Sequence, residues 1–154
     1  MLNKKEIINL KITAEDDEDL KVFSAYLQDS VIVVNDIKYL PKNRKFICIF
    51  NRFMWEDAER GIFRENKRIR SALVFNEVSS VKSKGINPKT KEKILEFLTI
   101  KLETHKESRV VKLIFSGGSI IKIEIDNILS TLEDFGKPWK TNYKPKHKIL
   151  NANI

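Results

Sequence analysis

The sequence is poor in cysteine and histidine, and these shortages exclude several kinds of site. With Cys48 as the single cysteine, the 154-residue chain cannot form an internal disulfide, and we expect a reducing, cytoplasmic location. The two histidines, His105 and His147, lie far apart, and nothing in the chain follows the spacing of a zinc site. Nucleophile motifs and nucleotide-binding fingerprints are also missing. We therefore predict no metal, no cofactor and no catalytic residue.

Long apolar runs are missing too. No stretch approaches the roughly 18 apolar residues of a membrane span, and residues 1–13 lack the apolar segment of a signal peptide. The fractions of hydrophobic residues (42%) and charged residues (32%) are ordinary for a globular domain. A chain of this length can bury roughly two thirds of its unfolded surface without a covalent staple. We expect residues 1–154 to form one domain that spans no membrane.

Arginine is scarce relative to lysine, and its distribution is uneven. The 29 basic residues include 7 arginines, of which 6 fall within residues 44–70. The chain favours lysine, isoleucine and asparagine, a codon bias that would replace arginine wherever charge alone matters. A guanidinium group has a planar fork of five donors that an ammonium group lacks, so the remaining arginines indicate bidentate contacts. These six are Arg44, Arg52, Arg60, Arg64, Arg68 and Arg70.

The chain is basic, with a formal charge of +8, and the charge is polarised along it. Residues 1–30 have a net charge of −3, whereas residues 136–148 have a net charge of +5. A basic protein suits an acidic partner, nucleic acid or an anionic membrane surface. Codon bias is the alternative source of the excess.

Hydrophobic periodicity predicts a helix followed by a run of strands. The spacing of Leu20, Phe23 and Leu27 predicts a helix over residues 14–28, with Thr13 as its N-cap. β-branched and alternating apolar segments predict about seven strands. These seven follow the helix, at residues 31–34, 37–40, 45–55, 68–86 and 95–103 and in the two arms of the segment 109–126, with a loop at 56–67. One further short strand, at residues 7–13, precedes the helix.

A second helix is predicted after Asp126, which is a suitable N-cap. An apolar stripe with helical spacing follows, and Gly136 then stands at the position of a C-terminal cap, with Pro138 just beyond. The stripe consists of Ile128, Leu129, Leu132 and Phe135.

Residues 109–126 predict a β-hairpin with two glycines near its centre. A two-residue turn would place Leu113 opposite Lys122 and mix core with surface. A three-residue turn over Gly117–Ser119 places Leu113 opposite Ile123 and keeps the apolar side chains on one face. The turn accounts for both glycines, so a phosphate-binding loop is not needed to explain them.

Together these elements predict an α+β fold. A curved, mostly antiparallel sheet or small barrel would carry an N-terminal helix and a C-terminal capping helix, an order that resembles the pleckstrin-homology-like superfold. Residues 137–154 would follow as a basic, irregular tail. We expect Trp139 to be buried and to hold this tail against the sheet.

Several segments together resemble a known family. They are AEDDEDLKVFSAYLQDS (14–30), DIKYLPKNRKF (36–46), NRFMWE (51–56), Phe115–Gly118, Leu132–Gly136, Pro138-Trp139 and Pro145–His147. With these segments the chain resembles a small family of uncharacterised alphaproteobacterial proteins, classed as a domain of unknown function. The resemblance runs over nearly the whole chain. It implies a cytoplasmic, single-domain bacterial protein, and it brings no activity, cofactor or catalytic residue.

The arginine segment is the strongest candidate for a binding site. If their strands are neighbours, Arg52, Arg68 and Arg70 converge on one exposed surface beside Trp55, with Arg44 near the start of the central strand. Guanidinium groups arranged in this way bind phosphate or carboxylate groups. The alternative is ordinary salt bridging to nearby glutamates, which contributes little at a surface.

The tail supplies a second candidate. Lysines interleaved with aromatic residues bind single-stranded nucleic acid through phosphate contacts and base stacking. The alternative is a tail that packs against the barrel. The residues that would contact the nucleic acid are Lys140, Lys144, Lys146 and His147.

Three functions follow from these sites. We favour a non-enzymatic, cytoplasmic binding or adaptor module that recognises an acidic protein surface or a phosphorylated ligand through the arginine segment. A nucleic-acid-associated protein that uses the basic tail is the alternative. A small-molecule enzyme with an arginine-lined pocket is the third reading.

Overall fold

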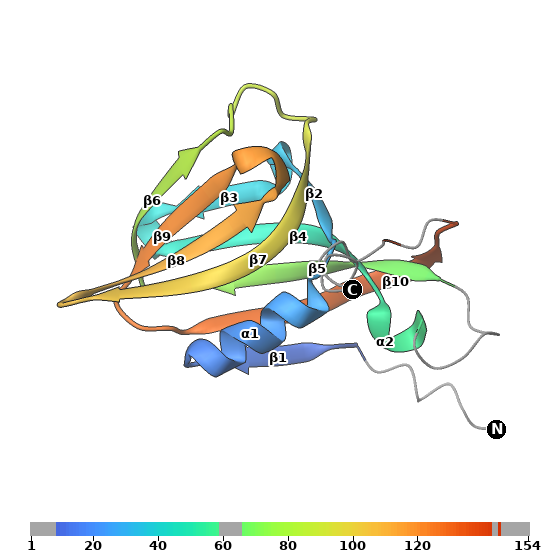
Figure 1. Cartoon of the computed structure of the whole chain (residues 1–154), viewed down its shortest axis with the longest axis horizontal. Coiled ribbons are helices and arrows are strands. Elements are labelled where there is room, and N and C mark those ends of the chain that lie inside the picture. The colour runs from blue at the N-terminus through green and yellow to red at the C-terminus, as the bar shows by residue number, and fades with distance from the viewer. Residues whose placement is uncertain (1–8, 59–65, 143–144, 146–154) are drawn as a thin grey trace, which may run out of the picture.

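One strongly curved antiparallel sheet dominates the computed structural model, which describes residues 9–58, 66–142 and 145 (Figure 1). Its strand order is β1-β10-β5-β4-β2-β7-β8-β9-β6. The remaining strand, β3, pairs with β4 and is not part of this order. The strands are β1 (Lys11–Ala14), β2 (Val31–Val33), β3 (Ile37–Leu40), β4 (Lys45–Phe53), β5 (Lys67–Phe75), β6 (Val78–Lys84), β7 (Ile94–His105), β8 (Ser108–Phe115), β9 (Ile120–Ile125) and β10 (Ser130–Lys140). The helical segments are α1 (Asp17–Tyr26), the single turn α2 (Trp55–Ala58) and three 3-10 turns, η2 (Val34–Asp36), η3 (Pro41–Asn43) and η4 (Ser116–Gly118).

The expected α+β fold with a helix at each end is wrong, because the predicted C-terminal helix is strand β10. Leu132 is buried, whereas its neighbour Glu133 is exposed, so the segment follows the two-residue period of a strand. β10 pairs with β1 on one side and β5 on the other, which satisfies its backbone groups along both edges. The fold is therefore mostly antiparallel β. The capping helix on which the pleckstrin-homology-like resemblance depended is absent from the described residues.

The N-terminal helix is present, but it starts later than predicted. Ala14 pairs with Ser130 in the sheet, so the backbone there is extended and cannot be helical. Asp16 is the N-cap, and its carboxylate accepts a hydrogen bond from the Asp19 backbone N–H at 2.8 Å. The acidic residues of the first turn match the positive end of the helix dipole.

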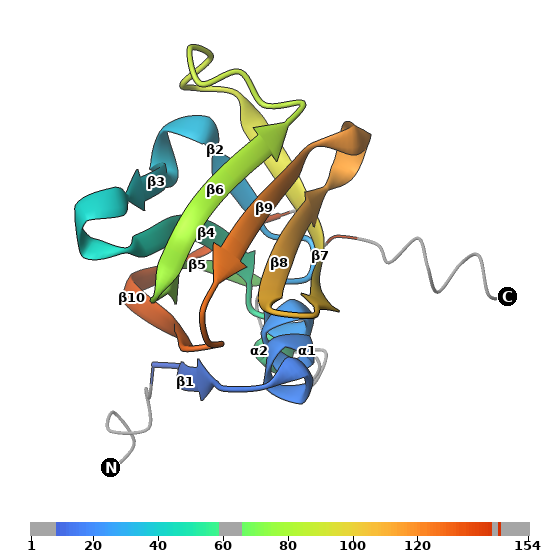
Figure 2. The ribbon, with the colours of Figure 1, turned by 90° about the vertical axis from the view of Figure 1, so that its left-hand side faces the viewer.

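The sheet curls around a single apolar core, and its β6 edge returns close to β4 and η3 (Figure 2). Rings from both halves of the sheet meet in this core. Phe50 of β4 packs edge-on against Phe97 of β7, with ring centroids 5.5 Å apart, and lies near Phe115 of β8. Helix α1 adds its two buried residues, Leu20 and Phe23, from beneath β7. The curvature thus allows one sheet to cover its own core.

The β8–β9 hairpin forms, although its turn and register differ from the prediction. Leu113 pairs with Ile121 rather than Ile123, and the turn is Ser116–Gly118 rather than Gly117–Ser119. The predicted apolar face is kept, because the shift is by two residues and preserves the strand period. Gly117 has a φ of 77°, a conformation that favours glycine.

Two further boundaries differ from the sequence prediction. The strand expected over residues 68–86 is divided into β5 and β6 at Glu77, which has a positive φ of 55°. The tail expected to be irregular from residue 137 begins as sheet, because β10 continues to Lys140 past a bulge between Phe135 and Trp139. The Trp139 residue is 40% exposed to solvent, so the prediction that it is buried is wrong.

Candidate functional site

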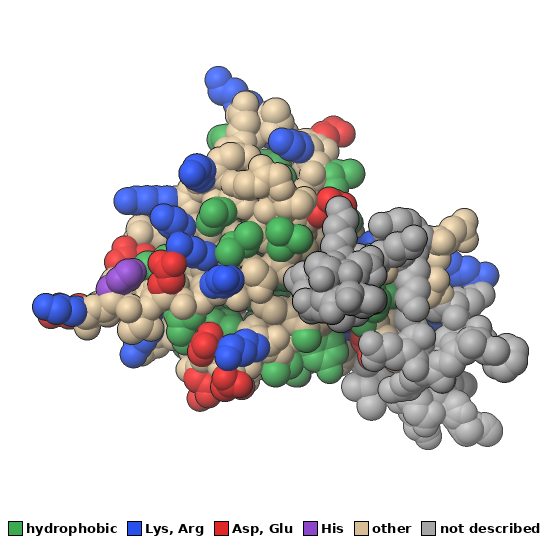
Figure 3. Space-filling view, viewed as in Figure 1, with side chains coloured by type: hydrophobic (Ala, Val, Ile, Leu, Met, Phe, Trp, Pro, Cys, Tyr) green, Lys and Arg blue, Asp and Glu red, His purple; other side chains and the backbone are tan. Residues whose placement is uncertain are grey.

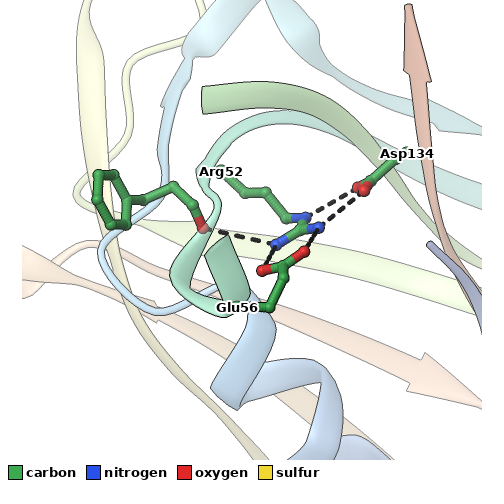
Figure 4. Close-up of polar contacts among 4 residues, drawn as sticks. Arg52, Glu56 and Asp134 are labelled. Atoms are coloured by element: carbon green, nitrogen blue, oxygen red, sulfur yellow. Dashed lines mark hydrogen bonds and ion pairs between the residues drawn. The ribbon is translucent and has the colours of Figure 1, made fainter. Parts of the chain in front are cut away.

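Arg52 lies in the interior, where two carboxylates hold its guanidinium group (Figure 4). Asp134 of β10 accepts hydrogen bonds from Nε at 2.8 Å and from Nη2 at 2.7 Å. Glu56 of α2 accepts from Nη1 at 3.0 Å and from Nη2 at 2.7 Å, and the Phe53 carbonyl is 3.5 Å from Nη1. The fork of five N–H groups is therefore saturated by the chain itself.

This carboxylate–guanidinium cluster, Arg52 with Glu56 and Asp134, determines the charge state of its centre. Burial alone would lower the pKa of Arg52, but the hydrogen bonds and negative charges of Asp134 and Glu56 raise it well above its ordinary value. Arg52 also lies over the Tyr26 ring of α1, 5.5 Å from the ring centroid. The cluster thus joins β4, α1, α2 and β10 around one permanent cation. Its arrangement suits a structural role, because no donor remains for a ligand.

The predicted convergence of the arginines on one exposed surface is wrong. Strand pairing sets Arg52 opposite Ile69, so both side chains share the inner face of the sheet. Arg68 and Arg70 flank Ile69 and therefore belong to the outer face. Because successive side chains of a strand point to opposite faces of the sheet, Arg52 cannot join Arg68 and Arg70 on the outer face.

The outer-face arginines have their own contacts. Arg68 is 9% exposed, donates to the Asn51 carbonyl at 3.0 Å and lies over the Phe53 ring. Arg70 is more exposed, with its Nη2 atom 3.5 Å from a carboxylate oxygen of Asp36. Their binding roles stay predictions.

Trp55, the aromatic member of the predicted site, is partly buried rather than displayed. Its indole N–H donates to the Gln28 carbonyl at 2.9 Å, and its ring packs edge-on against Phe53 at 4.6 Å. These contacts tie α2 to the chain segment after α1.

Arg44 occupies a separate place, in the turn before β4. Its backbone is left-handed, with a φ of 54°, and its guanidinium group pairs with the Asp126 carboxylate. This hydrogen bond and charge raise the pKa of Arg44. Arg109 of β8 donates to the Asp126 carbonyl at 2.6 Å, so an arginine from a turn and an arginine from a strand both contact Asp126.

The predicted tail site is described only at its start. Lys140 is exposed at the end of β10, whereas Lys144, Lys146 and His147 lie outside the described residues. Arg60 and Arg64 also lie outside them.

No described residues make a metal site or a reactive thiol. Among residues 9–58, 66–142 and 145, no group of three or more His, Cys, Asp or Glu side chains is placed to hold a metal ion. Cys48 is buried in β4, and burial raises the pKa of its thiol well above the ordinary value. A buried protonated thiol is a poor nucleophile.

A row of four lysines crosses the outer face of the sheet, and the sequence analysis missed it. Lys101 pairs with Lys112, Lys112 with Lys122, and Lys122 with Lys82, on the adjacent strands β7, β8, β9 and β6. In Figure 3 basic side chains gather over these strands, next to exposed hydrophobic side chains. Strands about 4.8 Å apart spread such a row over about 14 Å. We call these four residues the lysine row.

The lysine row carries more charge than its neighbours neutralise. Glu103 accepts a hydrogen bond from Lys112 at 2.6 Å, and this bond lowers the pKa of Glu103. Within the part of the chain that the structure describes, no salt bridge involves Lys82, Lys101 or Lys122. The signal in the sequence was a lysine at the middle of each strand, but only the register shows that they form one line.

These features define a β-rich domain with an internally neutralised arginine cluster and an outward basic row. A family model described as "Protein of unknown function (DUF2948)" matches residues 10–147. The chain belongs to this family. No curated protein and no solved structure matches it. Among the described residues, no helix combines the length and the apolar character needed to cross a membrane.

Proposed function

We propose that the chain is a single-domain, cytoplasmic, non-enzymatic binding module that recognises an acidic protein surface through its lysine row. The observation that carries the proposal is the direct cross-strand alignment of Lys101, Lys112, Lys122 and Lys82. Like charges placed directly opposite on adjacent strands oppose folding. Because these pairs cost stability, their alignment favours a role in binding over a role in folding.

The row's surroundings favour a protein over a nucleic acid. The cross-strand positions on one side of the row include Ile114 and Ile120, and exposed Leu98 lies farther along β7. Aliphatic side chains beside charged ones suit the mixed character of a protein–protein interface. No aromatic ring belongs to this part of the outer face, whereas binding of single strands relies on aromatic stacking.

The arginines enter the proposal as secondary contacts. Arg44 and Arg70 keep 48% and 45% of their side-chain surfaces exposed, so each could exchange its internal carboxylate for one on the partner. Arg68 and Trp55 both contact the Phe53 ring, and Arg68 lies two positions from Arg70 on the same face of β5, so they would support that contact. Arg52 contributes by holding the sheet together.

The test replaces Lys82, Lys101 and Lys122 with glutamine and leaves Lys112 with its acidic partner. Protein captured from a cell lysate by the wild type is identified, purified and titrated against both forms at 50 and 200 mM salt. We expect the variant to bind at least tenfold more weakly at low salt, which corresponds to about 1.4 kcal/mol. We also expect equal or greater resistance to urea, because the repulsion within the row is relieved.

A matched control carries the same loss of charge elsewhere. Lys42, Lys45 and Lys89 are exposed, and replacing them with glutamine leaves the row intact. Equal loss of binding in this control would show that net charge, and not the row, is recognised. Homopolymeric single-stranded RNA and vesicles of anionic lipid are titrated in parallel. Tight, row-dependent binding to either, with no acidic protein captured, would replace the proposal with the corresponding alternative.

A further inference from the structure

The curled sheet leaves a window between two strand edges. Among the described residues β3 pairs with β4 alone, and β6 pairs with β9 alone. Their other edges face the same gap, which can be followed between β3 and β6 in Figure 2. No strand fills this gap in the described part of the chain.

The window is closed at both ends by backbone hydrogen bonds. At one end the Val78 N–H donates to the Arg44 carbonyl at 2.9 Å. At the other end the loop after β6 crosses to η2, where the Asn35 N–H donates to the Lys91 carbonyl at 2.9 Å. An extended peptide added to either edge would run into these closures. The space therefore suits a compact ligand rather than an added strand.

A cavity of about 340 Å³ lies in this window. Ligand pockets in proteins range over about 300–1,000 Å³, so the cavity is at the small end of that range. At about 30 Å³ for a water-sized group, it holds on the order of ten non-hydrogen atoms. Its lining is Val34, Asn35, Ile37, Lys38, Tyr39, Phe46, Val81, Ser83, Ile86, Pro88, Lys91 and Ile121.

The lining combines an apolar interior with a cationic rim. Phe46 and Ile121 are buried core residues, and the half-buried Ile37 and Val81 pack against that core. The charged residues of the lining are two exposed lysines, Lys38 and Lys91, and it contains no acid. An apolar ligand that covers the exposed parts of Ile37 and Val81 removes apolar surface from water, which favours binding.

A second large cavity has the opposite character. It measures about 520 Å³ and lies between the start of α1 and the β9–β10 connection. Its lining includes the acidic residues Glu15, Asp16, Asp17 and Glu77. Desolvating these carboxylates would oppose an apolar ligand. The window between β3 and β6 is the better site for such a molecule.

We propose that the window binds a small amphipathic anion, with an unbranched alkyl body of about ten atoms and a carboxylate or phosphate head. The alkyl body covers the half-buried Ile37, Val81 and Ile86, and the head lies at the rim between Lys38 and Lys91. Ammonium groups bind such heads as point charges. This site is independent of the lysine row.

The test is a titration of the whole chain with decanoate, followed by calorimetry and by backbone amide NMR. We expect saturable binding of one decanoate per chain, with shift changes confined to the lining segments, which are residues 34–39, 46, 81–91 and 121. Decyl phosphate should bind at the same residues, whereas decanol should bind at least tenfold more weakly. Vesicles of phosphatidylglycerol distinguish a soluble amphiphile from a membrane lipid as the source of the head and chain.

The decisive variant reverses the rim charge with Lys38→Glu and Lys91→Glu, both at exposed positions. Its affinity for decanoate should fall at least tenfold. The control, Lys106→Glu with Lys137→Glu, makes the same charge change at exposed positions outside the cavity lining and should bind as the wild type does. The proposal is overturned if decanoate does not saturate, if the rim variant binds it equally well, or if the shift changes map to the lysine row.

Discussion

Replacing Arg52 with methionine should be among the most destabilising single changes in this protein. Methionine has a similar length but no charge, so Asp134, which is 3% exposed, would be left buried without its cation. Removing one partner of a buried ion pair costs about 3–5 kcal/mol. Domains are stable by only about 5–15 kcal/mol, so the loss is a large fraction of the total.

Two measurements give the size of this loss of stability. At about 2–4 °C for each kcal/mol in a chain of this size, the melting temperature should fall by roughly 6–20 °C. With a urea dependence of about 1–3 kcal/mol/M, the unfolding midpoint should fall by more than about 1 M. Circular dichroism measures both transitions. Arg52→Lys keeps the charge but loses the double fork, so its stability should lie between those of the wild type and the methionine variant.

A double variant separates the ion pair from general damage to packing. Arg52→Met together with Asp134→Leu removes both buried charges, and Glu56 is open enough to be solvated, with 31% of its side chain exposed. Buried ion pairs are often replaced by apolar residues at little cost. We therefore expect the double variant to recover most of the lost stability. The surface control Arg70→Met should cost less than about 1 kcal/mol. The reasoning is refuted if Arg52→Met costs no more than that control.

Three further predictions concern separate parts of the fold. The hydrogen bond from Lys112 lowers the pKa of Glu103 in the folded state. Ionised Glu103 therefore stabilises the fold fully above the unfolded pKa of about 4.3, and this stabilisation is lost as the pH falls through the folded pKa. The stability difference between the wild type and Glu103→Gln, measured by urea unfolding, should accordingly shrink below about pH 4, and a difference that grows there contradicts the assignment. The Cys48 thiol should react with an aromatic disulfide reagent only when the chain unfolds, since burial keeps it protonated; rapid labelling without denaturant would count against it. Gly117→Ala should cost about 1 kcal/mol through backbone strain alone, because a Cβ there meets nothing within 4 Å, and an unchanged urea midpoint would show that the turn tolerates alanine.

The elements with strong local signals were predicted from the sequence. The spacing of Leu20 and Phe23 indicated α1, and the alternating segments indicated most of the strands. Both patterns depend only on residues that are close together in the sequence. The prediction of a C-terminal helix was wrong because it also relied on local spacing alone. Leu132 and Phe135 are three apart and fit a helix, but pairing of β10 with both β1 and β5 decided the conformation. Such pairing involves partners about 60 and 120 residues away along the chain, which local periodicity does not contain.

The candidate sites show the same difference between what local sequence indicates and what contacts between distant residues decide. The scarcity of arginine indicated bidentate contacts, and Arg52 does make them, but with Asp134, which lies 82 positions away in the sequence. Nothing local could identify that partner. The lysine row was hidden by the hairpin register. The predicted register, with Leu113 opposite Ile123, places the preceding Lys112 opposite Glu124, whereas the structure sets Lys112 opposite Lys122. A shift of two residues thus changed an expected salt bridge into a repulsive pair.

The carboxylate–guanidinium cluster also sets an order of events during synthesis. Arg52 leaves the ribosome 82 residues before Asp134, and at about 5–20 residues per second the delay is about 4–16 s. During that interval β4 and β5 can pair, but their half of the interior would have to enclose an arginine without its buried counterion, which is unfavourable. Glu56 is available to Arg52 from the start, but burial of the cation becomes favourable only when β10 brings Asp134 and closes the sheet against β1.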